Sequence, residues 1–254
     1  MQSVAIYDKP VRLLMHDMAS EFALQPGEAF TRQRALDWFA EHYPKIKQGT
    51  ITAHLIRLST NAQSRLHYSA KPGDDDLFFQ IDSGHYRLYS TESDPAPICT
   101  VNGRKPTLPT GEDESEIQPS NEFAYERDLR NYLSKNLSII EAGLTLYEEE
   151  GINGIEFPVG GRYIDILAVD HTNSYVVIEL KVSRGYDRVV GQLMRYMAWI
   201  KKNQADSGQR VRGIIIARDI SEDLLLACSL LDDIQLFEYE LSLVLSEVGK
   251  EHGE

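Results

Sequence analysis

The chain has 254 residues, a net charge of −13 and 42% hydrophobic residues. It is long enough for one large domain or two modest ones, each with its own core. No apolar run reaches the roughly 18–20 residues that span a bilayer, and the first residues lack the pattern of a signal peptide. The two cysteines, Cys99 and Cys228, are too far apart to suggest a disulfide or zinc framework. These features predict a cytoplasmic globular protein that does not enter a membrane.

The charge is unevenly distributed along the chain. The acidic total disfavours a nucleic-acid binder, whose affinity rests on neutralising phosphates, but the distribution matters more than the total. No Asp or Glu occurs between His42 and Gly73, where several Lys and Arg fall, whereas acids collect at 74–76, 112–116 and 148–150. The basic stretch is a candidate binding face, although a cluster of this size also arises by chance.

The first 93 residues predict three helices followed by a hairpin. The helices are expected at about residues 10–24, 31–43 and 51–61, with Pro10 in the first turn of one and Thr31 as the N-cap of the next. Alternating apolar residues at 77–81 and 85–89, joined by Asp82-Ser83-Gly84, indicate two strands. We interpret residues 1–93 as a winged-helix DNA-binding domain.

The third predicted helix is the element that such a domain places in the major groove. Polar and basic side chains on or near it are candidates for contacts with bases and phosphates. They are Lys45, Lys47, Thr50, Thr52, His54, Arg57, Asn61 and Arg65. The stretch from Gly49 to Asn61, with Phe78-Phe79 and Tyr86-Arg87-Leu88-Tyr89, resembles winged-helix modules attached to restriction-type nucleases. Two alternatives stay open: a small helical bundle with an inert basic loop, and a winged helix used for protein contacts.

Residues 94–120 are rich in proline and acidic residues and lack apolar periodicity, which predicts a linker. Residues 121–248 then form a second domain. An amphipathic helix is expected at 123–136, two strands at 162–168 and 175–182 in a hairpin, and a helix at about 187–201. A strand at 214–217, a helix at 219–232 and a strand at 234–241 complete an α/β core.

Three charged residues interrupt the two apolar strands of the predicted hairpin. Glu179 and Lys181 lie on one face of their strand because alternate side chains share a face, and Asp165 interrupts the neighbouring strand. Charges in the middle of core strands are costly unless they are paired or functional. The two carboxylates and the carbonyl of Leu180 would form a hard oxygen site suited to Mg²⁺, with Mn²⁺ as a substitute. A lysine beside such a site can orient or deprotonate a water molecule that attacks a phosphate.

This pattern is the Asp-(x)n-Glu-x-Lys signature of the PD-(D/E)XK nuclease superfamily. Gln192 and Tyr196, one turn apart on the following helix, match a Gln-x-x-x-Tyr motif found in a branch of that superfamily. The C-terminal half resembles the catalytic domain of the NucS endonucleases along Phe123-Ala-Tyr-Glu-Arg-Asp-Leu, Gly161-Arg-Tyr-Ile-Asp-Ile-Leu-Ala, Val177-Ile-Glu-Leu-Lys and Gly191-Gln-Leu-Met-Arg-Tyr-Met. The resemblance implies an α/β fold of two domains, the second a restriction-endonuclease-like mixed sheet flanked by helices.

The resemblance also implies roles for individual residues. Asp165 and Glu179 would bind the metal, Lys181 would serve the attacking water, and Glu126 would complete the metal environment. Gln192 and Tyr196 would support the site or touch the phosphate backbone. Apart from the resemblance, Arg184, Arg188 and Arg195 lie on or near the same predicted helix and are candidate phosphate contacts, with ordinary surface arginines as the alternative. Simpler interpretations stay open: an edge-strand charge pair for Glu179 and Lys181, a solvated Glu126 paired with Arg130, and helix packing for Gln192 and Tyr196.

Three functions follow from these predictions. The first is a metal-dependent, restriction-type endonuclease that hydrolyses phosphodiester bonds of double-stranded DNA. The winged helix would read the target sequence, and a requirement for methylated cytosine in that sequence stays open. The second is a NucS-like repair endonuclease for mismatched or branched DNA, and the third is a DNA-binding regulator with a degenerate nuclease fold. A double-strand cut needs two active sites or two visits, so a homodimer is expected on functional grounds.

Overall fold

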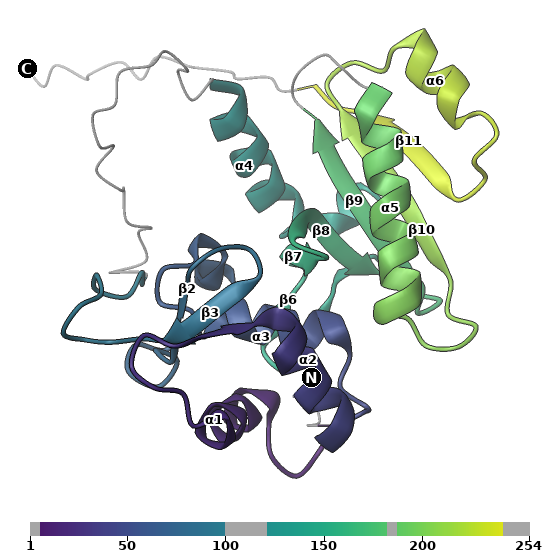
Figure 1. Cartoon of the computed structure of the whole chain (residues 1–254). Helices are drawn as coiled ribbons and strands as arrows, with labels where there is room; N and C mark the ends of the chain where they lie inside the picture. The colour runs from purple at the N-terminus through teal and green to yellow at the C-terminus, as the bar shows by residue number, and fades with distance from the viewer. Residues whose placement is uncertain (1–5, 100–120, 182–186, 241–254) are drawn as a thin grey trace, which may run out of the picture.

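The computed structural model describes residues 6–99, 121–181 and 187–240, which form two closely packed parts (Figure 1). The N-terminal part contains the helices α1 (Val11–Phe22), α2 (Arg32–His42) and α3 (Gln48–Arg57) and the 3₁₀ turn η1 (Gln63–His67). Its sheet has the order β1-β3-β2, with β1 (Ala29–Thr31), β2 (Phe78–Gln80) and β3 (His85–Leu88) all antiparallel.

Local sequence explains where these helices begin and end. The hydroxyl of Thr31 accepts a hydrogen bond from the Arg34 N–H, as its position before α2 predicts. The helix α3 ends at Arg57, four residues earlier than expected, because the chain then turns onto β2. There the Thr60 N–H donates to the Phe78 carbonyl at 2.8 Å. The predicted helices and hairpin are present in the expected order and β1 is an addition, while membership of the winged-helix class stays a prediction.

The C-terminal part is built on a mixed sheet of order β11-β10-β9-β8-β4, with β7 also paired to β8 (Figure 1). Its strands are β4 (Thr145–Leu146), β7 (Ile155–Val159), β8 (Arg162–Val169), β9 (Tyr175–Lys181), β10 (Val211–Ala217) and β11 (Ile234–Glu238). The strands β8 and β9 form the predicted antiparallel hairpin, whereas β9, β10 and β11 run parallel. A separate pair joins β5 (Glu148–Glu149) to β6 (Ile152–Asn153).

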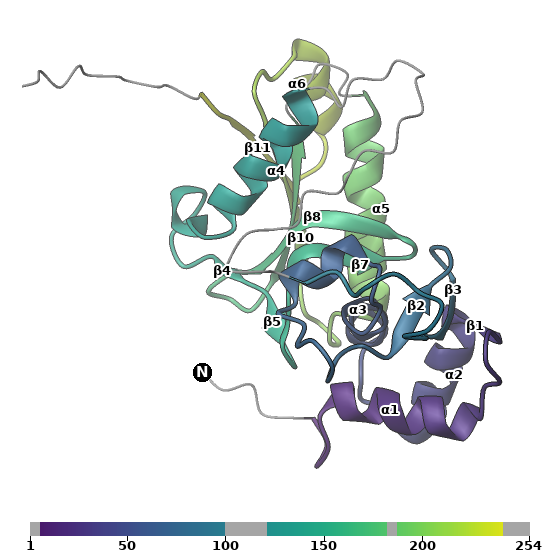
Figure 2. The ribbon, with the colours of Figure 1, turned by 90° about the vertical axis from the view of Figure 1, so that its left-hand side faces the viewer.

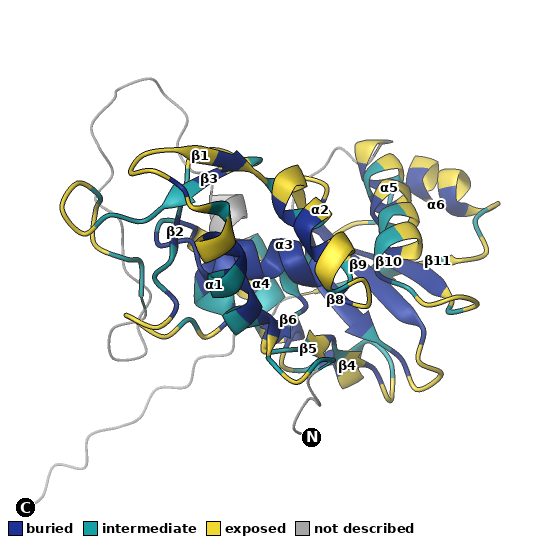
Figure 3. Cartoon of the chain, turned by 60° about the horizontal axis from the view of Figure 1, so that its bottom comes forward, coloured by how far each residue is buried: buried dark blue, intermediate teal, exposed yellow. Residues whose placement is uncertain are grey.

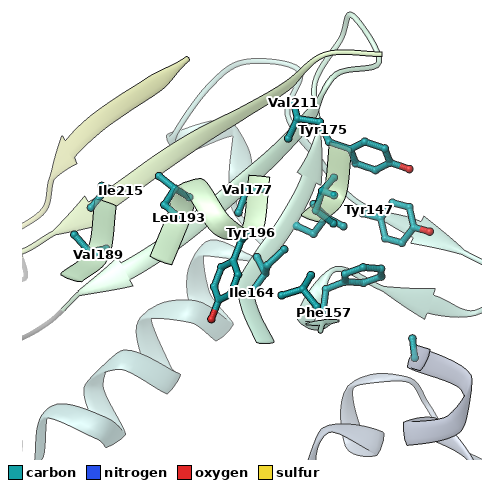
Figure 4. Close-up of a cluster of buried hydrophobic side chains, with 14 of the residues drawn as sticks. Tyr147, Phe157, Ile164, Tyr175, Val177, Val189, Leu193, Tyr196, Val211 and Ile215 are labelled. Atoms are coloured by element: carbon teal, nitrogen blue, oxygen red, sulfur yellow. The ribbon is translucent and has the colours of Figure 1, made fainter. Parts of the chain in front are cut away.

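Helices cover both faces of this sheet, which confirms the predicted mixed sheet flanked by helices. On one face, α5 (Asp187–Asn203) packs Val189 and Leu193 against Val177 and Ile215 (Figure 4). On the other, α4 (Asn121–Leu133) packs its leucines against Ile178 and Leu180 of β9. Because both faces are covered, β9 is apolar almost without interruption, as expected for a central strand. The short elements η2 (Leu137–Ile139) and α6 (Glu222–Cys228) add Leu137 and Leu224 to the apolar clusters on the two faces.

The helix α3 lies between the two parts and belongs to the cores of both. Ile51 and Leu55 pack in the N-terminal core, while Ala53 and Ile56 pack with Ile152 and Phe157 of the C-terminal part. The helix α3 contacts β6 and β7; Figure 2 shows it beside β7, and Figure 3 shows it in the colour of buried residues. The expectation of an exposed third helix is therefore wrong. The reason is that α3 has apolar residues on two faces, one for each core, and that its polar side chains form hydrogen bonds inside the protein.

Gly49 permits this close packing. A Cβ atom at this position would lie 2.7 Å from Phe157 Cζ and 2.5 Å from Gln204 Oε1. Such distances are too short for any residue with a side chain unless the neighbours move.

The beginning of the predicted linker is bound to the N-terminal part. The carboxylate of Asp94 accepts hydrogen bonds from Arg87, and the Ile98 N–H donates to the Thr60 carbonyl at 2.8 Å. Residues 100–120 of that linker and the predicted end of the second domain, 241–248, lie outside the described residues. Within the described ranges, no helix is both long and apolar enough to cross a membrane.

Candidate active site

Asp165, Glu179 and Lys181 line one cleft of about 440 Å³ at the end of the β8–β9 hairpin. Ile166 is opposite Ile178 in this hairpin, so the same register sets Asp165 opposite Glu179. The Leu180 N–H donates to Asp165 Oδ2 at 2.9 Å, which fixes the Asp165 side chain against β9. The tertiary structure thus brings together the three residues that the sequence pattern singled out.

Glu179 is almost completely buried, with 2% of its surface exposed. Its Oε1 accepts hydrogen bonds from Lys181 Nζ at 2.9 Å and from Gln192 Nε2, whereas its Oε2 is buried without a partner among the described residues. Burial and the nearby Asp165 carboxylate raise the pKa of Glu179 to about 8. Burial also raises the pKa of Asp165, against the opposing effects of the Leu180 N–H, Lys181 and Arg130.

Lys181 connects the strand acids to Glu126 on α4. Its Nζ lies 3.7 Å from Glu126 Oε1. Burial alone would lower the pKa of Lys181, but the carboxylates of Glu179, Asp165 and Glu126 outweigh burial and raise it. Burial and Asp165 raise the pKa of Glu126. Glu126 therefore faces the cleft, and the alternative of a solvated Glu126 paired with Arg130 is not what the structure shows.

Gln192 and Tyr196 lie on the face of α5 that covers the site. Gln192 Nε2 donates to Glu179 and also to the Tyr196 hydroxyl at 3.2 Å, and Tyr196 is buried in the apolar cluster under α5 (Figure 4). Gln192 thus contacts a candidate metal ligand directly. Tyr196 combines a packing position with a hydrogen bond to Gln192, so the two interpretations of this residue are compatible.

The residues of the cleft fit a divalent cation. Two adjacent carboxylates with raised pKa values and one unpartnered buried oxygen form an oxygen-rich site that a hard cation would stabilise. No group of three or more His, Cys, Asp or Glu side chains is placed to hold a metal in the described part of the chain. A cation at Asp165 and Glu179 would therefore need the Leu180 carbonyl and water as further ligands, which stays a prediction.

The structure adds residues to this cleft that sequence patterns missed. Arg130 of α4 donates to Asp165 Oδ1 at 3.5 Å and also to Glu156 of β7. Gln63, Leu66 and His67, from η1 of the N-terminal part, also line the cleft. The spacing of Arg130 from Glu126, one turn apart on α4, was a usable signal for the arginine. No local signal placed η1 at the cleft, because that contact depends on how the two parts pack.

The polar residues of α3 that were expected to contact DNA are buried instead. Thr50, Thr52 and His54 are at most 5% exposed. The Thr50 hydroxyl donates to Glu149 Oε2 at 2.5 Å, the Thr52 hydroxyl donates to the Gln48 carbonyl, and His54 Nδ1 lies 2.9 Å from the Thr50 carbonyl. These side chains form their hydrogen bonds inside the protein, and in this arrangement they do not reach a ligand outside it.

The basic residues near α3 are paired with the acids that follow them in sequence. Arg57 contacts Asp75 at 3.1 Å and Arg65 contacts Asp76 at 2.7 Å, both in buried positions. The Asn61 side chain donates a hydrogen bond to the Gln80 carbonyl and accepts one from the Gln80 N–H. Lys47 forms an ion pair with Asp206 at 2.6 Å. Lys45 is exposed. The expected basic face is therefore largely neutralised by internal ion pairs.

A second hollow, of about 570 Å³, adjoins the cleft and is basic. It is lined by Arg162 of β8 and by Arg188 and Arg195 of α5, together with Gly191, Gln192 and Tyr196. Gln192 lines both hollows, so the two are neighbours. The three arginines are exposed, and none has an ion-pair partner within the described residues. Arg184, the other predicted phosphate contact near this helix, lies outside the described residues.

Two family models match separate parts of the chain. Residues 10–88 match the family described as "Domain of unknown function (DUF7669)", and residues 125–241 match the family described as "Endonuclease NucS C-terminal domain". The second match includes the catalytic candidates, from Glu126 to Tyr196.

Sequence relatives carry the same family name. Endonuclease NucS of Pyrococcus abyssi is 31% identical over 98 residues, covering 38% of this chain and 35% of that protein. Endonuclease NucS of Sulfolobus acidocaldarius is 30% identical over 157 residues, covering 61% and 58%. The chain thus spans about a third to three fifths of the length of these relatives.

Two solved structures show weaker similarity. The crystal structure of a repair endonuclease from Pyrococcus abyssi has a TM-score of 0.38, with 24% identity over 50% of each chain. The EndoMS-dsDNA2 complex has a TM-score of 0.36, with 24% identity over 52% of this chain and 51% of that one. Residues 125–241 are thus similar to the C-terminal domain of endonuclease NucS.

Proposed function

We propose that this protein is a divalent-metal-dependent endonuclease that hydrolyses phosphodiester bonds of DNA. The observation that carries the proposal is the convergence of Asp165, Glu179 and Lys181 in one cleft, with a buried Glu179 oxygen that lacks a partner. The similarity of residues 125–241 to the NucS C-terminal domain supports it.

Each residue of the cleft has a role in this proposal. Asp165 and Glu179 would hold Mg²⁺ or Mn²⁺, which would stabilise the charge that develops on the phosphate. Lys181, whose pKa is raised by the surrounding carboxylates, is an ammonium suited to hold the attacking water in place. Gln192 donates to Glu179 and thereby orients its carboxylate. Glu126 provides a second contact for the Lys181 ammonium.

The arginine hollow gives the proposed path of the DNA backbone. Arg162, Arg188 and Arg195 adjoin the cleft and lack carboxylate partners among the described residues, so their charges are available for phosphates. In a chain with a net charge of −13, an unpaired positive cluster beside the candidate catalytic residues is the feature expected of a phosphate-binding surface.

A repair-type substrate is favoured over a restriction-type one. The restriction-type hypothesis depended on a helix that reads bases, and the burial of α3 removes that reader. Acting on mismatched or branched DNA, as in the second hypothesis, does not require a recognition helix in the major groove. We also propose a homodimer, because a double-strand cut needs two active sites, and light scattering of the full chain would show its mass.

The test is cleavage of labelled duplexes in the presence of Mg²⁺, with EDTA as the control. Plain, cytosine-methylated, mismatched and branched duplexes would be compared. We expect cutting of the mismatched or branched substrates, and a loss of about 100-fold or more in Asp165→Asn and Glu179→Gln, which weaken the cation site. Asp233→Asn, in an exposed ion pair with Arg210, is the matched carboxylate control. Full activity in Asp165→Asn would show that the cutting does not arise in this cleft, and binding without cutting of every duplex by the wild-type chain would support the DNA-binding regulator.

A further inference from the structure

Glu156 is an acidic residue of β7 that the proposed chemistry does not use. In the pairing of β7 with β8, Ile155 is opposite Ile166 and Phe157 is opposite Ile164, so Glu156 and Asp165 lie between these two pairs on neighbouring strands. Like charges that lie close together on neighbouring strands repel. Glu156 also has a φ of +48°, in the left-handed region that residues with side chains seldom adopt. Its place beside Asp165 therefore requires other groups that offset the charge repulsion and the unfavourable backbone conformation.

The compensation comes from both parts of the protein. Glu156 Oε2 accepts a hydrogen bond from the Ser64 hydroxyl at 2.5 Å and lies 3.5 Å from His67 Nε2, and the Tyr68 hydroxyl donates to the Glu156 carbonyl. Glu156 Oε1 accepts from Arg130. Burial would raise the pKa of Glu156, but His67, Arg130 and Ser64 outweigh burial and lower it to about 2. Glu156 is thus an ionised carboxylate with both oxygens engaged.

Arg130 connects this carboxylate to Asp165. One of its terminal nitrogens bonds Glu156, and the other lies 3.5 Å from Asp165 Oδ1. The guanidinium is largely buried, with 11% of the side chain exposed, so its position is set by these two acids. Without Glu156, the positive charge would turn entirely to Asp165 and would compete there with a cation.

We propose that Glu156 is a positioning residue that holds Arg130 away from a full ion pair with Asp165, and that Ser64 and His67 hold Glu156 in this role. The N-terminal part is then a component of the metal site and more than a separate binding module. This inference rests on the proposed function, because it assumes that Asp165 binds a divalent cation.

The experiment is calorimetric titration of the full chain with Mn²⁺ in the absence of DNA. We expect Glu156→Gln to bind Mn²⁺ about 10- to 100-fold more weakly, the range typical of residues that support metal ligands. Ser64→Ala removes a single hydrogen bond to Glu156 and should weaken binding in the same direction by a smaller factor. It also provides a milder variant if Glu156→Gln does not fold.

A double mutant separates positioning from general damage. If Arg130 is the competitor, then Arg130→Gln added to Glu156→Gln should restore the affinity for Mn²⁺ toward the wild-type value. A double mutant that binds as weakly as Glu156→Gln would overturn the proposal. Asp206→Asn, which breaks the Lys47–Asp206 ion pair between the same two parts, should leave the affinity unchanged. An equal loss in Asp206→Asn would attribute the effect to docking in general.

The outcome also distinguishes this inference from the proposed function. If the wild-type chain neither binds Mn²⁺ nor cuts DNA, the proposed function fails. If the wild-type chain does both and Glu156→Gln keeps its affinity for Mn²⁺, only the role of Glu156 fails.

Discussion

Gly49→Ala tests whether α3 is packed between the two parts as the structure shows. Two effects of opposite sign compete at this position. Alanine favours a helix over glycine by roughly 0.5–1 kcal/mol, and somewhat less in the first turn, where Gly49 lies. Against this, the added Cβ would meet Phe157 Cζ at 2.7 Å and Gln204 Oε1 at 2.5 Å. Both neighbours are held in place: the Gln204 side chain is buried and donates to the Tyr147 hydroxyl at 2.8 Å, and the Phe157 ring is fully buried and packs edge-on against Tyr147.

The steric effect should outweigh the helix preference. Overpacking of a close-packed core by one methyl group costs about 1–3 kcal/mol. We therefore expect Gly49→Ala to lower the free energy of unfolding by about 1 kcal/mol, after the gain in helix preference is subtracted. For a chain of this size, each kcal/mol corresponds to a change of roughly 2–4 °C in Tm.

Gly191→Ala is the matched control. Gly191 lies within α5, and a Cβ at this position would meet no atom within 4 Å. This variant should therefore raise the free energy of unfolding, by up to about 1 kcal/mol. Urea unfolding followed by circular dichroism would measure both variants. If Gly49→Ala stabilises the protein as much as Gly191→Ala does, α3 is not packed against Phe157, and the proposed role of the N-terminal part loses its basis.

Three further predictions concern the buried helix and the arginine hollow. Burial lowers the pKa of His54 from 6.5 to about 4, so the unfolded chain binds more protons between these values. Stability should therefore fall as the pH drops from 6.5 toward 4, by at most about 3 kcal/mol, and urea unfolding of His54→Gln should lack this component. Replacing Arg188 or Arg195 by Gln should reduce the slope of log K for DNA against log salt by about 0.9 each. Lys135 lines neither hollow, so Lys135→Gln should leave the slope unchanged. An unchanged slope in all three variants would place the DNA elsewhere. Thr52→Val should not alter DNA affinity, because the Thr52 hydroxyl bonds Gln48 inside the protein, and a tenfold loss in a filter-binding assay would restore α3 as a DNA contact.

The sequence by itself determined the local composition of the candidate site. Side chains alternate along a strand, so Glu179 and Lys181 had to share a face whatever the rest of the fold, and a turn of only a few residues made their strand a neighbour of the one that carries Asp165. Helical periodicity likewise placed Gln192 and Tyr196 on one face of α5. These relations depend on residues close together in the chain, and local geometry fixes them.

Only the tertiary structure decided which surfaces remain exposed. The polar residues of α3 have the composition of a DNA-reading helix, yet Ala53, Ile56 and Gly49 let its second face pack against Phe157. The link from Ser64 through Glu156 and Arg130 to Asp165 joins residues about 100 positions apart, and a strained backbone at Glu156 completes it. No spacing rule encodes such contacts, because they arise from the free energy of packing two folded surfaces together, which depends on their shapes and on the pairing of every buried charge.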